Sequence, residues 1–326
     1  MKYLILKIIY KIKAFKFIIL TLLIFLFIAV TLLIFLFNKA SIPNYKNNLN
    51  EYYTNSNNHE QKDTSFLNIE DRLNKSYKDQ LKNDVLNILQ DRKDNYAIYI
   101  KVINEDFEIG LNENELFYPA SIYKVPIAIL ILRDIENKKY SLDTALEITD
   151  EHKFYKTDTL YYYENGTFLS VKTLLEFMIC YSDNTAWDML QDNLLSDSKT
   201  IDLRMKEELD LTYTKRVPFQ TTAYEISLIF ENLYNNKYLN KESSDYLINL
   251  LSNIVQSQND RIPKGVPKDT KVAHKIGNWI GIYQDAGIIY GENLDYILVV
   301  LNKNSSVNDS KLIIQNISKT VWDYIN

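Results

Sequence analysis

One run of apolar residues limits what this chain can fold into. Every position from Val125 to Leu132 is apolar, with no polar residue to form a solvent face. A helix that is apolar all round has to be enclosed by other elements, so this segment predicts a buried helix inside a layered domain. Pro126 suits the first turn of that helix, where few amide hydrogens have helical partners to lose.

A serine and a lysine stand at the start of this helix. Ser121 and Lys124 are three residues apart, so on a helix they share one face, one turn from each other. A neutral lysine amine beside a hydroxyl can take its proton and make the oxygen a nucleophile. The bare Ser-x-x-Lys pattern is common and recurs at 196–199, so its weight depends on the buried helix and on motifs downstream.

Composition excludes several classes of protein. The 37 basic residues are balanced by 42 acidic ones, so there is no basic excess to predict a nucleic-acid partner. The single cysteine, Cys180, excludes an internal disulfide, and its apolar surroundings predict a core thiol. The three histidines are scattered along the sequence, so we expect neither a metal site nor a cofactor.

The N-terminal part of the chain predicts a membrane anchor. Residues 17–37 are almost continuously apolar, and at ~1.5 Å per helical residue they span a hydrocarbon core of ~30 Å. Lysines in residues 1–16 predict a cytoplasmic N-terminus, with the remainder outside the cell membrane in a single-pass arrangement. A cleaved signal peptide is the alternative, but no small-residue cleavage site follows the apolar run. Residues 38–78 are polar and predict a flexible linker.

Residues 79–326 predict one α+β domain. We expect five strands, at 96–102, 107–111, 271–275, 283–290 and 296–302. We expect helices at 79–92, from 121 onwards, at 170–179 with Ser170 as its cap, at 185–195, from a capping box at 222–225, at 243–255 and at 309–325. Strands from both ends would join in one antiparallel five-stranded sheet flanked by helices, with an all-α subdomain of about 121–255 inserted between them.

Two further motifs follow Ser121 and Lys124 along the chain. They are Ser182-Asp183-Asn184, which ends an apolar helix, and Lys275-Ile276-Gly277 in a predicted strand. This series resembles the penicillin-recognising serine enzymes, and is most similar to the class A β-lactamases, whose signatures are S-x-x-K, S-D-N and K-T-G. The resemblance covers about 79–326 and implies a β-lactamase/transpeptidase-like fold.

The resemblance implies a role for each matching residue. Ser121 would be the nucleophile, Lys124 its base, Ser182 the proton relay and Lys275 a second cation that lowers the pKa of Lys124. Substrate would be held by Asn184, Gly277 and Asn278, with the backbone N–H groups of Ser121 and Asn278 forming an oxyanion hole. Asp183 would brace its own turn. His274 would be structural or exposed, and Tyr161, Tyr162 and Tyr163 would either line the cleft or pack within a loop.

The sequence departs from the family pattern in two places. Ile276 replaces the Thr or Ser whose hydroxyl helps to hold a substrate carboxylate in the family. The segment 209–222 is short and contains no counterpart of the class A glutamate that activates the deacylating water. Glu207 and Glu208 lie in a helical pattern and are not assigned that role. Slow release of an acyl-enzyme is therefore expected.

Three functions remain open at this point. The leading one is a membrane-anchored serine hydrolase that opens β-lactam amides through an acyl-Ser121 intermediate. The second is a penicillin-binding D-Ala-D-Ala peptidase or transpeptidase acting on peptidoglycan peptides, which the missing glutamate favours. The third is a non-catalytic sensor of the same fold, which Ile276 favours.

Overall fold

The structure is a computed structural model that describes residues 75–195 and 198–326. The predicted basic segment at 1–16, the membrane helix at 17–37 and most of the linker at 38–78 lie outside these residues. Of the helices that are described, none combines the length and apolar character needed to cross a membrane.

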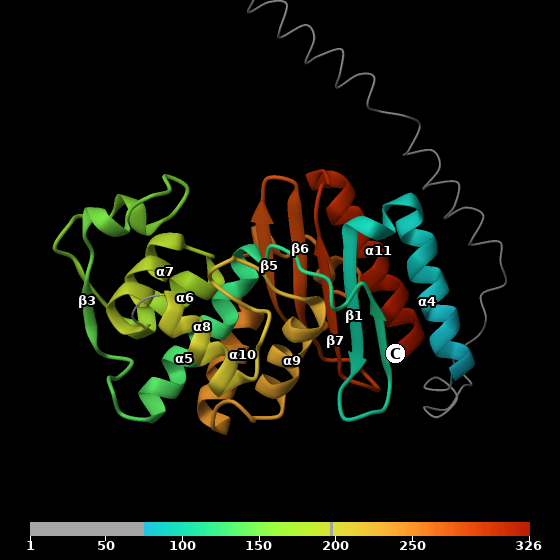
Figure 1. Ribbon diagram of the computed structural model, residues 1–326, viewed down its shortest axis with the longest axis horizontal. Helices are drawn as coiled ribbons and strands as arrows, with labels where there is room; N and C mark the ends of the chain where they lie inside the picture. The colour runs from blue at the N-terminus through green and yellow to red at the C-terminus, as the bar shows by residue number, and fades with distance from the viewer. Residues whose placement is uncertain (1–74, 196–197) are drawn as a thin grey trace, which may run out of the picture. The chain divides into compact units, whose positions relative to one another are not determined.

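A five-stranded antiparallel sheet forms the framework, as predicted (Figure 1). Its order is β2–β1–β7–β6–β5, so the N-terminal hairpin pairs with the C-terminal strands through β1 and β7. The strands are β1 (Tyr96–Val102), β2 (Glu108–Leu111), β5 (Val272–Trp279), β6 (Ile282–Ile289) and β7 (Tyr296–Asn302). Strand β7 pairs with β1 on one side and β6 on the other, in the interior of the sheet, and every one of its residues is buried.

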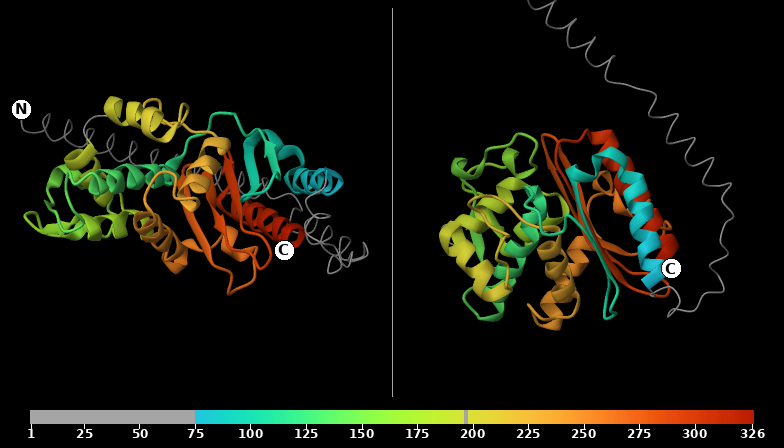
Figure 2. Two further views of the ribbon diagram at one scale, coloured as in Figure 1. Left: turned by 90° about the horizontal axis from the view of Figure 1, so that it is seen from below. Right: turned by 45° about the vertical axis from the view of Figure 1, so that its right-hand side comes forward.

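Helices cover both faces of the sheet. Helices α4 (Lys75–Leu89) and α11 (Val307–Ile325) pack together on one face (Figure 2). Helix α9 (Ala223–Tyr234) packs against β1, β6 and β7, on the side of the inserted helical block. Alternate residues of β1 enter two separate apolar clusters, with Ala97 and Tyr99 in one and Ile98 and Ile100 in the other. A sheet covered in this way explains why its strands are apolar on both faces.

The helical block lies between β2 and β5 in the sequence. Its remaining helices are α5 (Lys124–Glu136), α6 (Val171–Cys180), α7 (Asn184–Leu190), α8 (Ser198–Leu209) and α10 (Lys241–Ser252). Every residue of α5 from Val125 to Leu132 is buried, which confirms the predicted enclosed helix. Ser170 caps α6 as predicted, because its side chain accepts from the N–H of Thr173.

Several boundaries differ from the predictions. Helix α4 includes residues 75–78, which were assigned to the linker, and it ends in a 3-10 turn at Gln90–Asn95 instead of continuing to residue 92. The predicted helix at 185–195 becomes π-helical at Gln191–Leu195. Strand β5 ends four residues later than predicted, since it continues through the third motif to Trp279.

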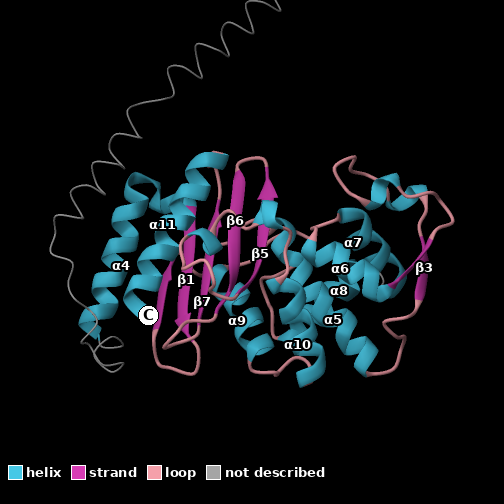
Figure 3. Ribbon diagram, turned by 180° about the vertical axis from the view of Figure 1, so that it is seen from behind, coloured by secondary structure: helices cyan, strands magenta, loops and turns pink. Residues whose placement is uncertain are grey.

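The segment between α5 and α6, which has no clear period in the sequence, forms a separate small unit. Strands β3 (Ala145–Glu147) and β4 (Phe168–Ser170) pair antiparallel, with 3-10 turns at Asp150–His152 and Leu160–Tyr162 between them. Figure 3 shows β3 at the end of the helical block, away from the main sheet. Three-residue strands are too short to produce a readable alternation in the sequence.

Two predictions about single residues hold. Cys180 is a buried free thiol whose sulfur donates to the carbonyl of Leu250. His274 is structural and 1 % exposed, with Nδ1 2.8 Å from Asp285 Oδ1 and Nε2 2.9 Å from Asn259 Oδ1.

Candidate active site

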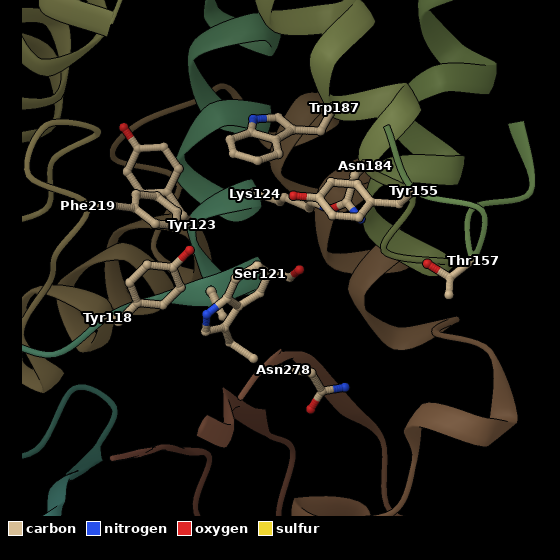
Figure 4. A pocket seen from close by; sticks show the side chains of 12 residues that line it. Tyr118, Ser121, Tyr123, Lys124, Tyr155, Thr157, Asn184, Trp187, Phe219 and Asn278 are labelled. Carbon is tan, nitrogen blue, oxygen red and sulfur yellow. The ribbon is translucent and has the colours of Figure 1, made fainter. Parts of the chain in front are cut away.

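A cavity of about 250 Å³ opens between β5, α7 and the turn that carries Ser121 (Figure 4). The turn is a 3-10 helix, η3 (Ala120–Tyr123), which leads directly into α5. The lining residues come from five separate parts of the chain: Tyr118, Ala120, Ser121, Tyr123, Lys124, Tyr155, Thr157, Asn184, Trp187, Phe219, Asn278 and Trp279. The first motif therefore lies at a junction of sheet and helical block, as the element order predicts.

Ser121 lies at the first turn before the buried helix, partly exposed to the cavity. The residue before it, Ala120, has φ 46°, in the left-handed region that residues with a Cβ rarely occupy. Such a conformation costs about 1–3 kcal/mol and persists only where the surroundings enforce it, which is typical of functional turns. The amide end of the helix favours negative charge near the serine oxygen.

Lys124 is 1 % exposed and is held by the second motif. Its Nζ donates to the carbonyl oxygen of Ser182 at 2.6 Å, to that of Asp183 at 3.3 Å and to Asn184 Oδ1 at 2.8 Å. Burial lowers the pKa of Lys124 to about 8, while nearby carboxylates, Asp158 first among them, oppose the change. A lysine with this pKa exchanges its proton near neutral pH, which a base for Ser121 has to do.

Asn184 is oriented from both sides of its amide group. While Oδ1 accepts from Lys124, Nδ2 donates to Asp158 Oδ1 at 3.1 Å. Asp158 also accepts from the N–H of Thr185 at 3.2 Å. The carboxylate of Asp183 caps α7 through the N–H of Ala186 and accepts from the N–H of Leu160, so it braces its turn. No motif or period in the sequence marks Asp158, because it lies in the aperiodic segment.

Ser182 contributes its backbone to Lys124 and is not one of the residues lining the cavity. Its φ of 59° again lies in the left-handed region. A left-handed residue is a common end of a helix, and here it follows the C-cap of α6, with its carbonyl oxygen accepting from Lys124.

Lys275 is fully buried behind the cavity wall. It is 0 % exposed, and its Nζ has no hydrogen-bond partner among the residues that the structure describes. Burial, followed by the positive charge of Lys124, lowers the pKa of Lys275 well below its ordinary value. The two amines of the first and third motifs are therefore electrostatic neighbours, and an uncharged Lys275 is the form that this environment favours.

Gly277 and Asn278 bring strand β5 against the serine turn. A Cβ at Gly277 would lie 2.9 Å from the carbonyl oxygen of Pro119, so only glycine permits this approach. Gln284 on β6 closes the same contact, because its Nε2 donates to the carbonyl oxygens of Tyr118 and Pro119 at 2.9 and 2.6 Å. Asn278 Oδ1 accepts from Nη2 of the buried Arg261 at 2.6 Å. The sequence analysis missed Gln284, which no motif marks.

Carboxylates are missing from the cavity wall. None of the twelve lining residues is Asp or Glu. Glu208, which the sequence analysis set aside, pairs with Arg133 and Arg204 on α5 and α8. Glu225 completes only half of the predicted capping box. Its N–H donates to Thr222, but its carboxylate accepts from the N–H groups of Thr212, Tyr213 and Thr214.

Aromatic side chains dominate the wall instead. Tyr155 lines the cavity, whereas Tyr161, Tyr162 and Tyr163 do not, which favours loop packing for those three. Trp187 lies three residues after Asn184 on α7, a spacing that places both on one helix face and that could have identified it. Its ring is stacked on Phe219 and lies 5.7 Å from Lys124 Nζ.

The fold and the grouped motifs are those of the β-lactamase-like serine enzyme fold. A family model described as the beta-lactamase enzyme family matches residues 80–325, so the chain belongs to this family. It is 26 % identical over 273 residues to the beta-lactamase VEB-1 of Pseudomonas aeruginosa, covering 76 % of this chain and 90 % of that protein. It is 22 % identical over 254 residues to a beta-lactamase of Phocaeicola vulgatus, covering 69 % and 78 %.

Solved structures share the fold. The TLA-3 extended-spectrum beta-lactamase superposes with a TM-score of 0.69 at 23 % identity, covering 76 % of this chain and all of that one. A mutant of PBP-A, solved as its acyl-enzyme complex with penicillin G, gives a TM-score of 0.69 at 21 % identity, covering 75 % and 95 %. Both hydrolytic and penicillin-binding proteins thus share this architecture.

Proposed function

We propose that this chain is a serine hydrolase that opens β-lactam amides by acylation of Ser121 and releases the product slowly. The observation that carries the proposal is the contact of Lys124 Nζ with Ser182, Asp183 and Asn184 at the edge of a cavity that Ser121 lines. The Lys124 amine can lose or take up a proton near neutral pH, and the Ser121 hydroxyl near it lines the cavity, which supports nucleophilic catalysis.

The reaction begins with proton transfer from Ser121 to Lys124. As a free amine, Lys124 has two N–H donors for its carbonyl partners and one lone pair for the serine proton. Ser121 Oγ bonds to the amide carbonyl carbon, and the C–N bond then breaks. Lys124 then gives up the proton it took from Ser121, and this proton goes to the departing nitrogen, with the Ser182 hydroxyl as the relay that the family resemblance implies. Backbone N–H groups of Ser121 and Asn278 stabilise the oxyanion, a contribution of about 3–4 kcal/mol in comparable sites.

The composition of the cavity supports slow deacylation. Hydrolysis of the ester needs a base that activates water, and no carboxylate lines the described wall. Of the glutamates nearest in sequence, Glu208 is committed to arginine pairs and Glu225 to backbone N–H groups. The acyl-enzyme therefore lacks the group that the class A enzymes use to hydrolyse it.

Intact-mass spectrometry of the full-length chain with benzylpenicillin tests both steps. We expect a mass increase equal to one benzylpenicillin that persists for many minutes in the wild type and is absent in Ser121→Ala. Equal labelling of the two proteins would contradict the proposal. A transient adduct with rapid penicillin turnover would retain Ser121 as nucleophile and contradict slow release.

The second candidate is a D-Ala-D-Ala peptidase or transpeptidase acting on peptidoglycan peptides. The same missing carboxylate favours it, since enzymes of this kind retain penicillin as a lasting adduct. Release of D-alanine from a peptide that ends in D-Ala-D-Ala, measured against Ser121→Ala, distinguishes it from the first. A folded wild type without any Ser121-dependent labelling or release would instead support a non-catalytic sensor.

We also propose that residues 17–37 anchor the enzyme in the cell membrane, with the catalytic domain outside. The support is the apolar sequence and the lysines before it. Alkaline extraction of membranes followed by protease treatment of intact cells tests this. Release of the chain by alkali would contradict the anchor, and protection of the domain from the protease would contradict its orientation.

A further inference from the structure

The cavity wall is aromatic and carries a single basic side chain. Six of its twelve residues are aromatic: Tyr118, Tyr123, Tyr155, Trp187, Phe219 and Trp279. In Figure 4 the five labelled rings, those of all but Trp279, lie around Ser121 and Lys124, with Asn278 below. Lys124 is the basic residue among the described lining residues. Recognition of a substrate carboxylate normally uses a charge-assisted hydrogen bond, so the availability of each nearby cation decides what this cavity accepts.

Two buried cations, Lys275 on β5 and Arg261 before it, are not accessible to a ligand in the cavity. The Nζ atom of Lys275 has no accessible surface, and its side chain is 0 % exposed. Arg261 is 1 % exposed, and its guanidinium is directed at Asn278 Oδ1 at 2.6 Å and Asp260 Oδ1 at 3.5 Å. A ligand in the cavity contacts neither cation without displacing the atoms that cover it. Ile276 is 4 % exposed and supplies no hydroxyl.

The remaining cations are engaged with other groups. Lys124 directs its N–H groups at three carbonyl oxygens, those of Ser182, Asp183 and the Asn184 side chain. Arg216 is not a lining residue, and its guanidinium lies against the rings of Trp187 and Phe219 at 4.7 and 5.3 Å. Among the described residues, the wall therefore presents rings and uncharged polar groups to the part of a substrate beside the scissile amide.

We infer that the substrates of this site are amides with an uncharged, apolar group beside the scissile bond, and that a free carboxylate there contributes little to binding. This inference rests on the acyl-Ser121 chemistry proposed above and adds the substrate class to it. Aromatic rings gain free energy by covering apolar surface, and they offer nothing that offsets the desolvation of a carboxylate.

Benzylpenicillin and its methyl ester form the test pair, because they differ only at the carboxyl group, which is a charged carboxylate in the first and an uncharged methyl ester in the second. The second-order rate constant of Ser121 acylation is measured for each with the full-length chain by intact-mass spectrometry. We expect the two constants to agree within about threefold. A carboxylate held by a charge-assisted hydrogen bond would instead make the acid react about tenfold faster or more.

The outcomes separate this inference from the proposed function. Labelling of Ser121 by both compounds at similar rates supports both. Labelling by the acid with a preference of about tenfold or more overturns the inference and leaves acylation intact. Labelling by neither compound overturns the proposed chemistry and, with it, the substrate class.

The aromatic wall has its own matched pair of variants. Tyr155 lines the cavity, whereas Tyr162 is 70 % exposed and lies outside it. We expect Tyr155→Ala to slow acylation by both penicillins about threefold or more, and Tyr162→Ala to leave both rates unchanged. An unchanged rate in Tyr155→Ala would contradict a binding role for this ring.

Discussion

Gln284 Nε2 donates to the carbonyl oxygen of Pro119 at 2.6 Å, which joins strand β6 to the turn that carries Ser121. A second bond from the same nitrogen reaches the carbonyl oxygen of Tyr118. Gln284 is 0 % exposed and its bond to Pro119 is buried, so that carbonyl has no ready substitute partner in water. The position of the nucleophile is therefore set by a residue that is 163 positions away in the sequence from Ser121.

Replacing Gln284 should harm both stability and acylation. In Gln284→Ala two buried carbonyl groups lose their donor, so we expect a loss of about 1–3 kcal/mol in the free energy of unfolding. The serine turn also loses its tie to β6, so acylation by benzylpenicillin should slow about tenfold. Urea unfolding and intact-mass kinetics measure the two effects.

Asn112 provides the control for Gln284, because its Nδ2 also donates to two backbone carbonyls, those of Lys93 and Tyr96, at the opposite edge of the sheet. Asn112→Ala should lower stability and leave the acylation rate of the folded protein unchanged. If both variants slowed acylation equally, the effect of Gln284 would be one of general stability.

The acylation rate should rise with pH through the pKa of Lys124. Burial disfavours the cation and lowers this pKa to about 8, so the free-amine fraction grows as pH increases. At pH 7 about a tenth of Lys124 is free amine, and at pH 9 about nine tenths, which predicts roughly a tenfold rise in rate. Acylation rate constants across this range provide the measurement. A flat profile would exclude Lys124 as the base and direct attention to Lys275, whose pKa burial also lowers.

The Lys275 side chain should lower the stability of the fold while it increases the rate at which Ser121 is acylated. Its buried Nζ has no described partner, so Lys275→Met replaces an unsatisfied polar group with an apolar chain of similar length. We expect the melting temperature to rise by about 2–4 °C and acylation to fall about a hundredfold. Lys264→Met, at an exposed position before β5, should change neither the melting temperature nor the acylation rate. A marked loss of stability in Lys275→Met would show that the amine has a structural partner.

Glu225 should be the main support of the loop that follows α8. Its carboxylate, 4 % exposed, accepts from the N–H groups of three successive residues, Thr212 to Thr214. Glu225→Ala leaves these donors unpaired and should lower the free energy of unfolding by about 3 kcal/mol. Glu225→Gln retains one acceptor and should lose less. Equal, small losses in both variants, measured by urea unfolding, would mean that water replaces the carboxylate.

Much of the fold follows from local patterns in the sequence. The strands β1 and β7 occupy the predicted residues, and Ser170 and Thr222 cap the predicted helices. Other features are not visible in the hydrophobic periodicity of the sequence. Examples are the π-helical turn after Leu190 and the short strand pair β3 and β4. The third motif extends its strand because β6 pairs with it as far as Trp279.

The sequence by itself determined the motifs, their order and the enclosed helix behind Ser121, because each is written in residues close together in the chain. The tertiary structure decided which groups share the cavity and in what state of charge. Gln284, Asp158 and the aromatic wall come from distant segments, and their contacts exist only after packing. Burial, likewise a property of the folded chain, is what separates Lys124 from an ordinary surface lysine and leaves Lys275 without a partner among the described residues.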